Sequence, residues 1–463
     1  MVSTDKSKSV LFFPNVVVIQ ILFYLLFIPV LWFMYLQDLT GSLYLFEFMV
    51  IVLLCSIFIF NYMCGIYINS LYSLFLITFT LFICGRVISH ILSHSVNAYS
   101  LDFFALYTLN EKDAIKLLIY VLLFLCALDL GYKFSFSKKI TLPACELNED
   151  WCKKFCMFAL MLSPIYLFEL TLSAKEAFTG GYLSSKLWQA QGYSFPLSSL
   201  AQTFFNIGLA YAIATGFKRK LYIAIYIYII LCATLIGARG PIVSGFLFLI
   251  WLWGGGGKRD IGIIKLGLLG VGVIFCVSFF IQMFSFRADG NNFDVSLMKF
   301  ISDFLYNQGI SLMVFDASTK VTDYPVLAYF QNFIPGISAI ASLFYPVDYV
   351  SSGFQYYMSN ILDPILFSQG FGLDWTLLSD LYVFGGQNII GYTLLAFLFG
   401  FLMSSLQNST TKIFWYVFTV AIFTRLIFLP RSTFSSLFPF CMYFFILIYF
   451  LPRFKIGNGK NNS

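Results

Sequence analysis

The sequence has few charged residues and almost no histidine. Asp, Glu, Lys and Arg make up 11% of the 463 residues, and 2 residues are histidine. The scarcity of histidine argues against a histidine-based metal site. With 60% hydrophobic and 20% aromatic residues, the composition also excludes a soluble domain. The composition is that of a polytopic integral membrane protein.

Long apolar segments recur along the chain. A helix needs about 20 apolar residues to cross a bilayer, and it must satisfy its own backbone groups there. We predict an all-α bundle of about twelve transmembrane helices. The expected spans are 16–36, 43–60, 71–91, 114–132, 155–173, 199–217, 221–237, 240–254, 262–284, 387–406, 413–429 and 434–451. Residues 1–284 then form nine spans, residues 285–386 one large loop, and residues 387–463 three spans and a tail.

The positions of the basic residues predict the orientation. If the amino terminus is cytoplasmic, most lysines and arginines fall in short cytoplasmic loops, as in Lys218-Arg219-Lys220. Both termini are then cytoplasmic, and the large loop lies on the outer side. The net charge of +6 reflects this topology, and we expect no nucleic-acid partner.

The large outer loop is predicted to be folded. Residues 297–315 place leucine, isoleucine and phenylalanine at helical spacing, which indicates an amphipathic helix. Four prolines divide the rest into short pieces: Pro325, Pro335, Pro346 and Pro364. The aromatic residues between Tyr324 and Tyr357 fit either a belt at the headgroup level or a surface that stacks on sugar rings.

Four arginines map to the outer end of the bundle: Arg239, Arg287, Arg425 and Arg431. The segment Gly237-Ala238-Arg239-Gly240-Pro241 breaks an apolar run, so the next helix offers its amino end to an anion. Arg425 lies inside a span, where burial costs about 2.5 to 3.5 kcal/mol and requires a partner or a wet cavity. Guanidinium groups suit phosphate oxygens. We predict that these arginines hold an anionic group; the alternative is that each anchors a helix end at the interface.

Further polar residues lie on the expected outer side. Asp289 and Asp294 follow Arg287 and can pair with it or act as a base. Asp380 and Tyr382 precede the tenth span and can face an outer cavity. Arg86, His90 and His94 share one helix face, which fits a metal pair, a proton relay or interfacial anchoring.

With these residues the chain resembles the Wzy-type O-antigen or oligosaccharide repeat-unit polymerases. The resemblance depends on the many-helix body and on the large outer loop before the last spans. It also depends on short motifs: Gly237-Ala238-Arg239-Gly240, Asp380-Leu381-Tyr382 with Phe384-Gly385 and Gly391, and Arg425 with Arg431. It implies an inverting glycosyltransferase of the GT-C type at the periplasmic face of a Gram-negative inner membrane. Such enzymes need no metal and no cofactor.

The resemblance also implies substrates and partners. A growing glycan moves from its undecaprenyl pyrophosphate carrier onto the non-reducing sugar of a lipid-linked repeat unit. Arg239, Arg287, Arg425 and Arg431 suit the leaving pyrophosphate, because fixed cationic donors stabilise the charge that develops there. Asp289 is the first choice of base, followed by Asp294, Asp303 and Asp380. Asp380 and Tyr382 join the expected substrate-binding set, and a chain-length regulator and a flippase are further expected partners.

Two other functions stay open. A ligase of related architecture would transfer the finished glycan to a lipid core, but such ligases place a histidine in the large outer loop. Residues 285–386 contain none. A transporter or lipid-linked glycan flippase should keep ionisable groups near the midplane and often has two related halves. We find no convincing internal repeat, so the sequence favours the polymerase.

Overall fold

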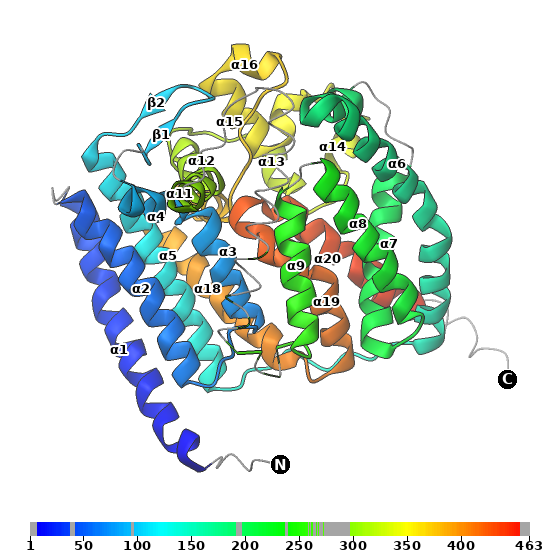
Figure 1. Ribbon diagram of the computed structural model, residues 1–463, viewed down its shortest axis with the longest axis horizontal. Coiled ribbons are helices and arrows are strands. Elements are labelled where there is room, and N and C mark those ends of the chain that lie inside the picture. Colours follow the sequence, from blue (N-terminus) through cyan, green and yellow to red (C-terminus); the bar gives the residue numbers. More distant parts are fainter. Residues whose placement is uncertain are drawn as a thin grey trace.

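The described chain is a bundle of long helices with a layer of short helices over one end (Figure 1). The computed structural model describes residues 7–37, 42–93, 97–190, 197–236, 239–257 and 297–453, and single positions between 259 and 272. Within these ranges, eight helices are long and apolar enough to cross a membrane. Together they confirm the prediction of an all-α polytopic bundle.

The helices before the masked region follow the expected spans. They are α1 (Ser7–Leu36), α2 (Leu43–Met63), α3 (Leu71–Phe82), α4 (Gly85–Leu92), α5 (Glu111–Ser137), α6 (Glu149–Ala190), α7 (Ser198–Thr215), α8 (Arg219–Ile236) and α9 (Arg239–Trp253). The expected span 71–91 is bent by 57° between α3 and α4. The expected span 262–284 falls largely outside the described residues.

Three further segments complete the bundle. They are α18 (Ile389–Ser409), α19 (Ile413–Phe428), and a last span built from η3 (Phe434–Ser436), α20 (Phe438–Phe444) and the π-helical η4 (Phe445–Phe450). The start of α1 and the end of η4 lie on the side of the bundle away from the short helices (Figure 1). That arrangement agrees with termini on one side and the large loop on the other.

We call residues 297–384 the cap. It consists of α11 (Leu297–Gln308), α12 (Ser311–Thr319), α13 (Val326–Gln331), α14 (Ile337–Ala341), η1 (Tyr349–Ser352), α15 (Phe354–Leu362), α16 (Pro364–Ser368) and α17 (Leu377–Phe384). Beside it, β1 (Ser100–Leu101) pairs antiparallel with β2 (Tyr107–Thr108). The amphipathic pattern is confirmed, since Phe304 and Leu312 are buried while Asp303 is exposed.

Many aromatic residues of the cap pack against one another. The rings of Tyr324, Phe354 and Trp375 lie with their centroids 5.2 to 5.7 Å apart. Neither sequence interpretation anticipated this aromatic core. Phe344, by contrast, is 82% exposed, and Tyr345 and Tyr349 are also exposed. Phe330 and Phe333 are exposed as well, so a belt or a sugar surface stays possible for the exposed rings of this segment and not for the buried ones.

Helices α5 and α18 approach each other closely at two glycines. A Cβ atom on Gly131 would lie 2.0 Å from the carbonyl oxygen of Phe397, and one on Gly400 would lie 2.0 Å from that of Leu128. Small residues permit such backbone contact in membrane bundles. Because α5 is buried along most of its length, this contact fixes the centre of the bundle.

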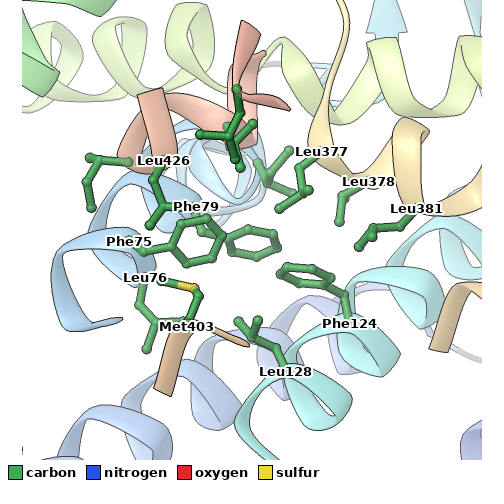
Figure 2. Close-up of a cluster of buried hydrophobic side chains, with 14 of the residues drawn as sticks. Phe75, Leu76, Phe79, Phe124, Leu128, Leu377, Leu378, Leu381, Met403 and Leu426 are labelled. Atoms are coloured by element: carbon green, nitrogen blue, oxygen red, sulfur yellow. The ribbon is translucent and has the colours of Figure 1, made fainter. Parts of the chain in front are cut away.

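The cap is attached to the bundle through α17. Figure 2 shows leucines of α17 pointing into a cluster with side chains of the bundle helices: Leu377, Leu378 and Leu381 meet Phe75 and Phe79 of α3, Phe124 of α5 and Met403 of α18. All these side chains are nearly fully buried. Dense apolar packing of this kind holds α17 at a defined height above the bundle.

Gly131→Leu should destabilise the bundle. The added side chain meets the α18 backbone, and overpacking of this kind costs about 3 kcal/mol. We expect a lower thermal unfolding midpoint in detergent for this variant. Leu394→Phe is the matched control, because Leu394 lies on α18 but is 58% exposed. An unchanged midpoint for Gly131→Leu would contradict the close contact.

Candidate functional site

Several chain segments meet at the cap end of the bundle, around the end of α19. Helix α19 ends at Phe428, and the short turn η2 (Leu429–Arg431) follows with Pro430 in its middle, where proline prevents the helix from continuing. A Cβ atom on Gly240 would lie 2.2 Å from the ring of Phe428, so the start of α9 touches the end of α19. We call this region the arginine junction. It comprises the end of α19 with η2, the start of α9, the end of α11 and the part of α17 around Asp380.

Arg425 lies in the last turn of α19 and is half-buried. Its Nη1 donates a hydrogen bond to the carbonyl oxygen of Ser436 at 2.7 Å. The guanidinium also lies over the ring of Phe440, 4.4 Å from the centroid. A charged group in a span therefore has neutral partners that hold its position and leave its positive charge in place.

Arg431 ends η2, six residues after Arg425, and it too is half-buried. Its Nη1 donates to Oε1 of Gln308 at 3.0 Å, across 123 positions of the chain. The guanidinium lies 5.8 Å from the centroid of the Phe82 ring, near the bend between α3 and α4. Arg431 thus lies where the cap, α3 and the end of α19 meet.

Asp380 joins the cap to the segment that carries Arg431. Its side chain is fully buried. Oδ1 accepts hydrogen bonds from the indole of Trp375 at 2.8 Å and from the hydroxyl of Thr433 at 3.5 Å, and Oδ2 accepts from the backbone N–H of Phe434 at 2.6 Å. Burial raises the pKa of Asp380 to about 8, although these hydrogen bonds favour the ionised form.

Tyr382 lies on another side of α17 from Asp380. Its ring packs edge-on against Tyr120, with centroids 5.8 Å apart, and near Phe315. The half-buried ring therefore belongs to an aromatic cluster beside α5 and α12. The structure separates these two expected substrate-binding residues, and a substrate role for either stays a prediction.

The structure describes only part of the expected site. Arg287, Asp289 and Asp294 lie outside the described residues. Arg239 begins α9 at the arginine junction, but its side chain is outside the described part. Asp303 is exposed on α11. The structure therefore brings Arg425, Arg431 and the backbone of Arg239 to one region.

The face that carries Arg86 and His90 has structural partners. Nη1 of Arg86 donates to the carbonyl oxygens of Ala98 and Ser100, and its guanidinium lies 4.2 Å from the centroid of the Tyr306 ring. His90 Nδ1 lies 2.8 Å from Oε1 of the buried Glu47. His94 is outside the described residues. In the described part of the chain, no three His, Cys, Asp or Glu residues form a group that could hold a metal.

Sequence reasoning missed the neutral residues of the junction. Gln308 contacts Arg431. The Thr433 hydroxyl lies 2.8 Å from Oδ1 of Asn332 and 3.5 Å from Oδ1 of Asp380, and it shares its one proton between these two acceptors. Single amides and hydroxyls carry no spacing signal. The one available hint was that Gln308 precedes Gly309 at the end of the predicted amphipathic helix.

An all-α bundle of long apolar helices, with a cap of short helices over one end, defines a class of polytopic membrane proteins. The family model of the O-antigen polysaccharide polymerase Wzy matches residues 16–456, and the chain belongs to this family. Membership assigns it an O-antigen polymerase function in general terms, with lipid-linked oligosaccharides in a membrane as substrates. Comparisons with curated proteins and with solved structures give no match.

Asp380→Ala should destabilise the attachment of the cap. It leaves the buried donors of Trp375 and Phe434 without an acceptor, which costs on the order of 3 kcal/mol. We expect a lower thermal midpoint and faster proteolysis of the cap. Asp374→Ala removes an exposed carboxylate nearby and should change neither.

The stability of the cap should also fall as pH rises. Folded Asp380 keeps its proton up to about pH 8, whereas the unfolded chain releases it near 3.8. The native state therefore binds more protons between these values, and its stability declines with rising pH across that window. The thermal midpoint measured from pH 5 to pH 9 should show this decline, and Asp380→Asn should flatten it. An equal slope in both proteins would contradict the assignment.

Proposed function

We propose that this protein joins undecaprenyl-pyrophosphate-linked oligosaccharide repeat units into O-antigen or a related surface polysaccharide. The reaction takes place at the periplasmic face of a bacterial inner membrane. It is a metal-independent, inverting transfer of the GT-C type. The observation that carries this proposal is the approach of Arg425, Arg431 and the start of α9 at one end of the bundle, beneath the cap.

The chemistry needs cationic donors at the leaving group. A hydroxyl oxygen of the acceptor sugar attacks the anomeric carbon of the donor glycan, and the bond from that carbon to the pyrophosphate oxygen breaks. The pyrophosphate leaves on its lipid with the bonding electron pair, while the hydroxyl proton passes to a base. A single displacement inverts the anomeric centre. Arginines fixed at the leaving oxygens lower the barrier, because negative charge grows there in the transition state.

The positions of Arg425 and Arg431 support this role. Both lie within one short stretch of chain at the cap end, next to the amino end of α9, whose backbone N–H groups favour an anion. Arg425 contacts the carbonyl oxygen of Ser436 and the ring of Phe440, and neither group carries a charge that would cancel its own. Arg239 and Arg287 complete the proposed pyrophosphate set.

Asp289 remains the first choice of general base. Asp380 is a weaker choice, because its carboxyl is buried and accepts hydrogen bonds from three protein donors. Asp303 is exposed on α11, and Asp294 follows Asp289 closely in the chain. Tyr382 and Asp380 stay in the proposed substrate-binding set.

The glycan ladder of a deletion strain tests the function. Loss of a polymerase should leave glycans of a single repeat unit on the lipid core, and the gene carried on a plasmid should restore the ladder. Long glycans that are not attached to the core would instead identify a ligase. A complete lack of surface glycan would identify a flippase.

Arg431→Ala should shorten the ladder to single units in the complemented strain. Removing one fixed donor at a developing charge costs about 100- to 1,000-fold in rate. Arg431→Lys should restore little, because the planar fork is lost. Arg453→Ala is the matched control, since Arg453 stacks on Tyr449 at the opposite end of the bundle. A full ladder from an inserted Arg431→Ala protein would exclude Arg431 from the chemistry.

A further inference from the structure

Gln308 has an unpaired side-chain amide nitrogen at the arginine junction. It is the last residue of α11, and its side chain is 1% exposed. Its Oε1 accepts from Nη1 of Arg431 at 3.0 Å. Its Nε2 is buried and has no hydrogen-bond partner within the described part of the chain.

The contact with Arg431 fixes which way the amide points. A guanidinium has only donors, so the amide oxygen must face it and the NH₂ group must point elsewhere. Leaving such a buried donor without an acceptor costs about 1 to 3 kcal/mol, and folded proteins rarely do so. An acceptor from outside the described chain is therefore expected at this position.

The backbone holds Gln308 in place. A Cβ atom on the adjacent Gly309 would lie 2.2 Å from the backbone nitrogen of Arg86, so the end of α11 lies directly against α4. The guanidinium of Arg86 is turned to the carbonyl oxygens of Ala98 and Ser100. The side chain of Gln308 thus extends from a rigid point toward Arg431.

We propose that Gln308 is a substrate-binding residue whose Nε2–H donates to a diphosphate oxygen of the lipid-linked glycan held at Arg431. This inference rests on the proposed function and adds a neutral donor to its arginines. An amide beside a guanidinium suits a group with several oxygens, because each donor takes a different one. The hydrogen bond strengthens as the leaving oxygens gain charge, so Gln308 also assists the transfer.

The test measures the binding of defined anions to purified protein in phosphatidylcholine nanodiscs. The probes are undecaprenyl pyrophosphate and inorganic pyrophosphate, with phosphatidylglycerol as the competing phosphodiester. Gln308→Ala should weaken the binding of both diphosphates about 10- to 100-fold, as expected for a hydrogen bond to a charged group. Asn307→Ala is the matched control, because Asn307 is the exposed neighbouring amide.

Gln308→Glu keeps the size of the side chain and separates binding from folding. Its carboxylate can pair with Arg431, so the thermal midpoint should hold or rise while diphosphate binding falls below that of Gln308→Ala. Unchanged diphosphate binding in a folded Gln308 variant would overturn the proposal and indicate that a water satisfies Nε2. Equal competition by phosphatidylglycerol would also overturn it and indicate a general lipid headgroup site.

The variant Arg431→Ala distinguishes a failure of the inference about Gln308 from a failure of the proposed function. If Arg431→Ala loses diphosphate binding while Gln308→Ala keeps it, the inference about Gln308 fails and the proposed function stands. If both variants bind as the parent protein does, the arginine junction is not the diphosphate site, and the proposed mechanism fails with it.

Discussion

The geometry of the candidate site depends on the hydrogen bonds of the buried carboxyl group of Asp380. It belongs to the cap, yet it accepts hydrogen bonds from Thr433 and Phe434 of the segment between the last two spans. Thr433 lies two residues after Arg431, which the same segment carries. Because unpaired buried donors are costly, the cap and this segment must be in register for all the hydrogen bonds to form. The position of Arg431 is therefore determined by a contact between two parts of the chain more than fifty residues apart.

The contact of Asp380 can position Arg431 only if α17 is itself held in place by the bundle. The two close glycine contacts fix α5 against α18, and the apolar cluster in Figure 2 seats α17 on α3, α5 and α18. Deeper in the bundle, Tyr24 and Tyr72 donate to the fully buried Asp129, which ties α1 and α3 to α5. Isolated polar groups are expensive in an apolar interior, so each such contact restricts how the helices can move. Because these contacts hold the helices in place relative to one another, they also hold the residues of the candidate site in place.

The sequence predicted the parts of this fold that depend on local composition. Spans follow from the thickness of the bilayer. The pattern of residues 297–315 predicted one amphipathic helix, because helical periodicity is a local property, and the structure divides it into α11 and α12. The bend between α3 and α4 was not predicted; at this bend α11 lies against Gly85, a contact between parts of the chain far apart in sequence. The arginines were recognisable because charge is rare in a span. Gln308 and Thr433 were not, because a neutral side chain acquires its role only from a partner distant in sequence.

The arginines differ in how deeply they are buried and in which groups they contact. Arg86 is nearly fully buried and turned to the backbone carbonyls of Ala98 and Ser100, just before and at the start of β1, so its charge stabilises the scaffold. Arg425 and Arg431 are half-buried, and a carbonyl, an amide and aromatic rings hold them. A carboxylate partner would neutralise a guanidinium, whereas the carbonyl oxygen of Ser436 and the ring of Phe440 orient Arg425 without adding a negative charge. Orientation without neutralisation suits the diphosphate-binding role proposed for Arg425, because an oriented guanidinium that keeps its charge still attracts an anion.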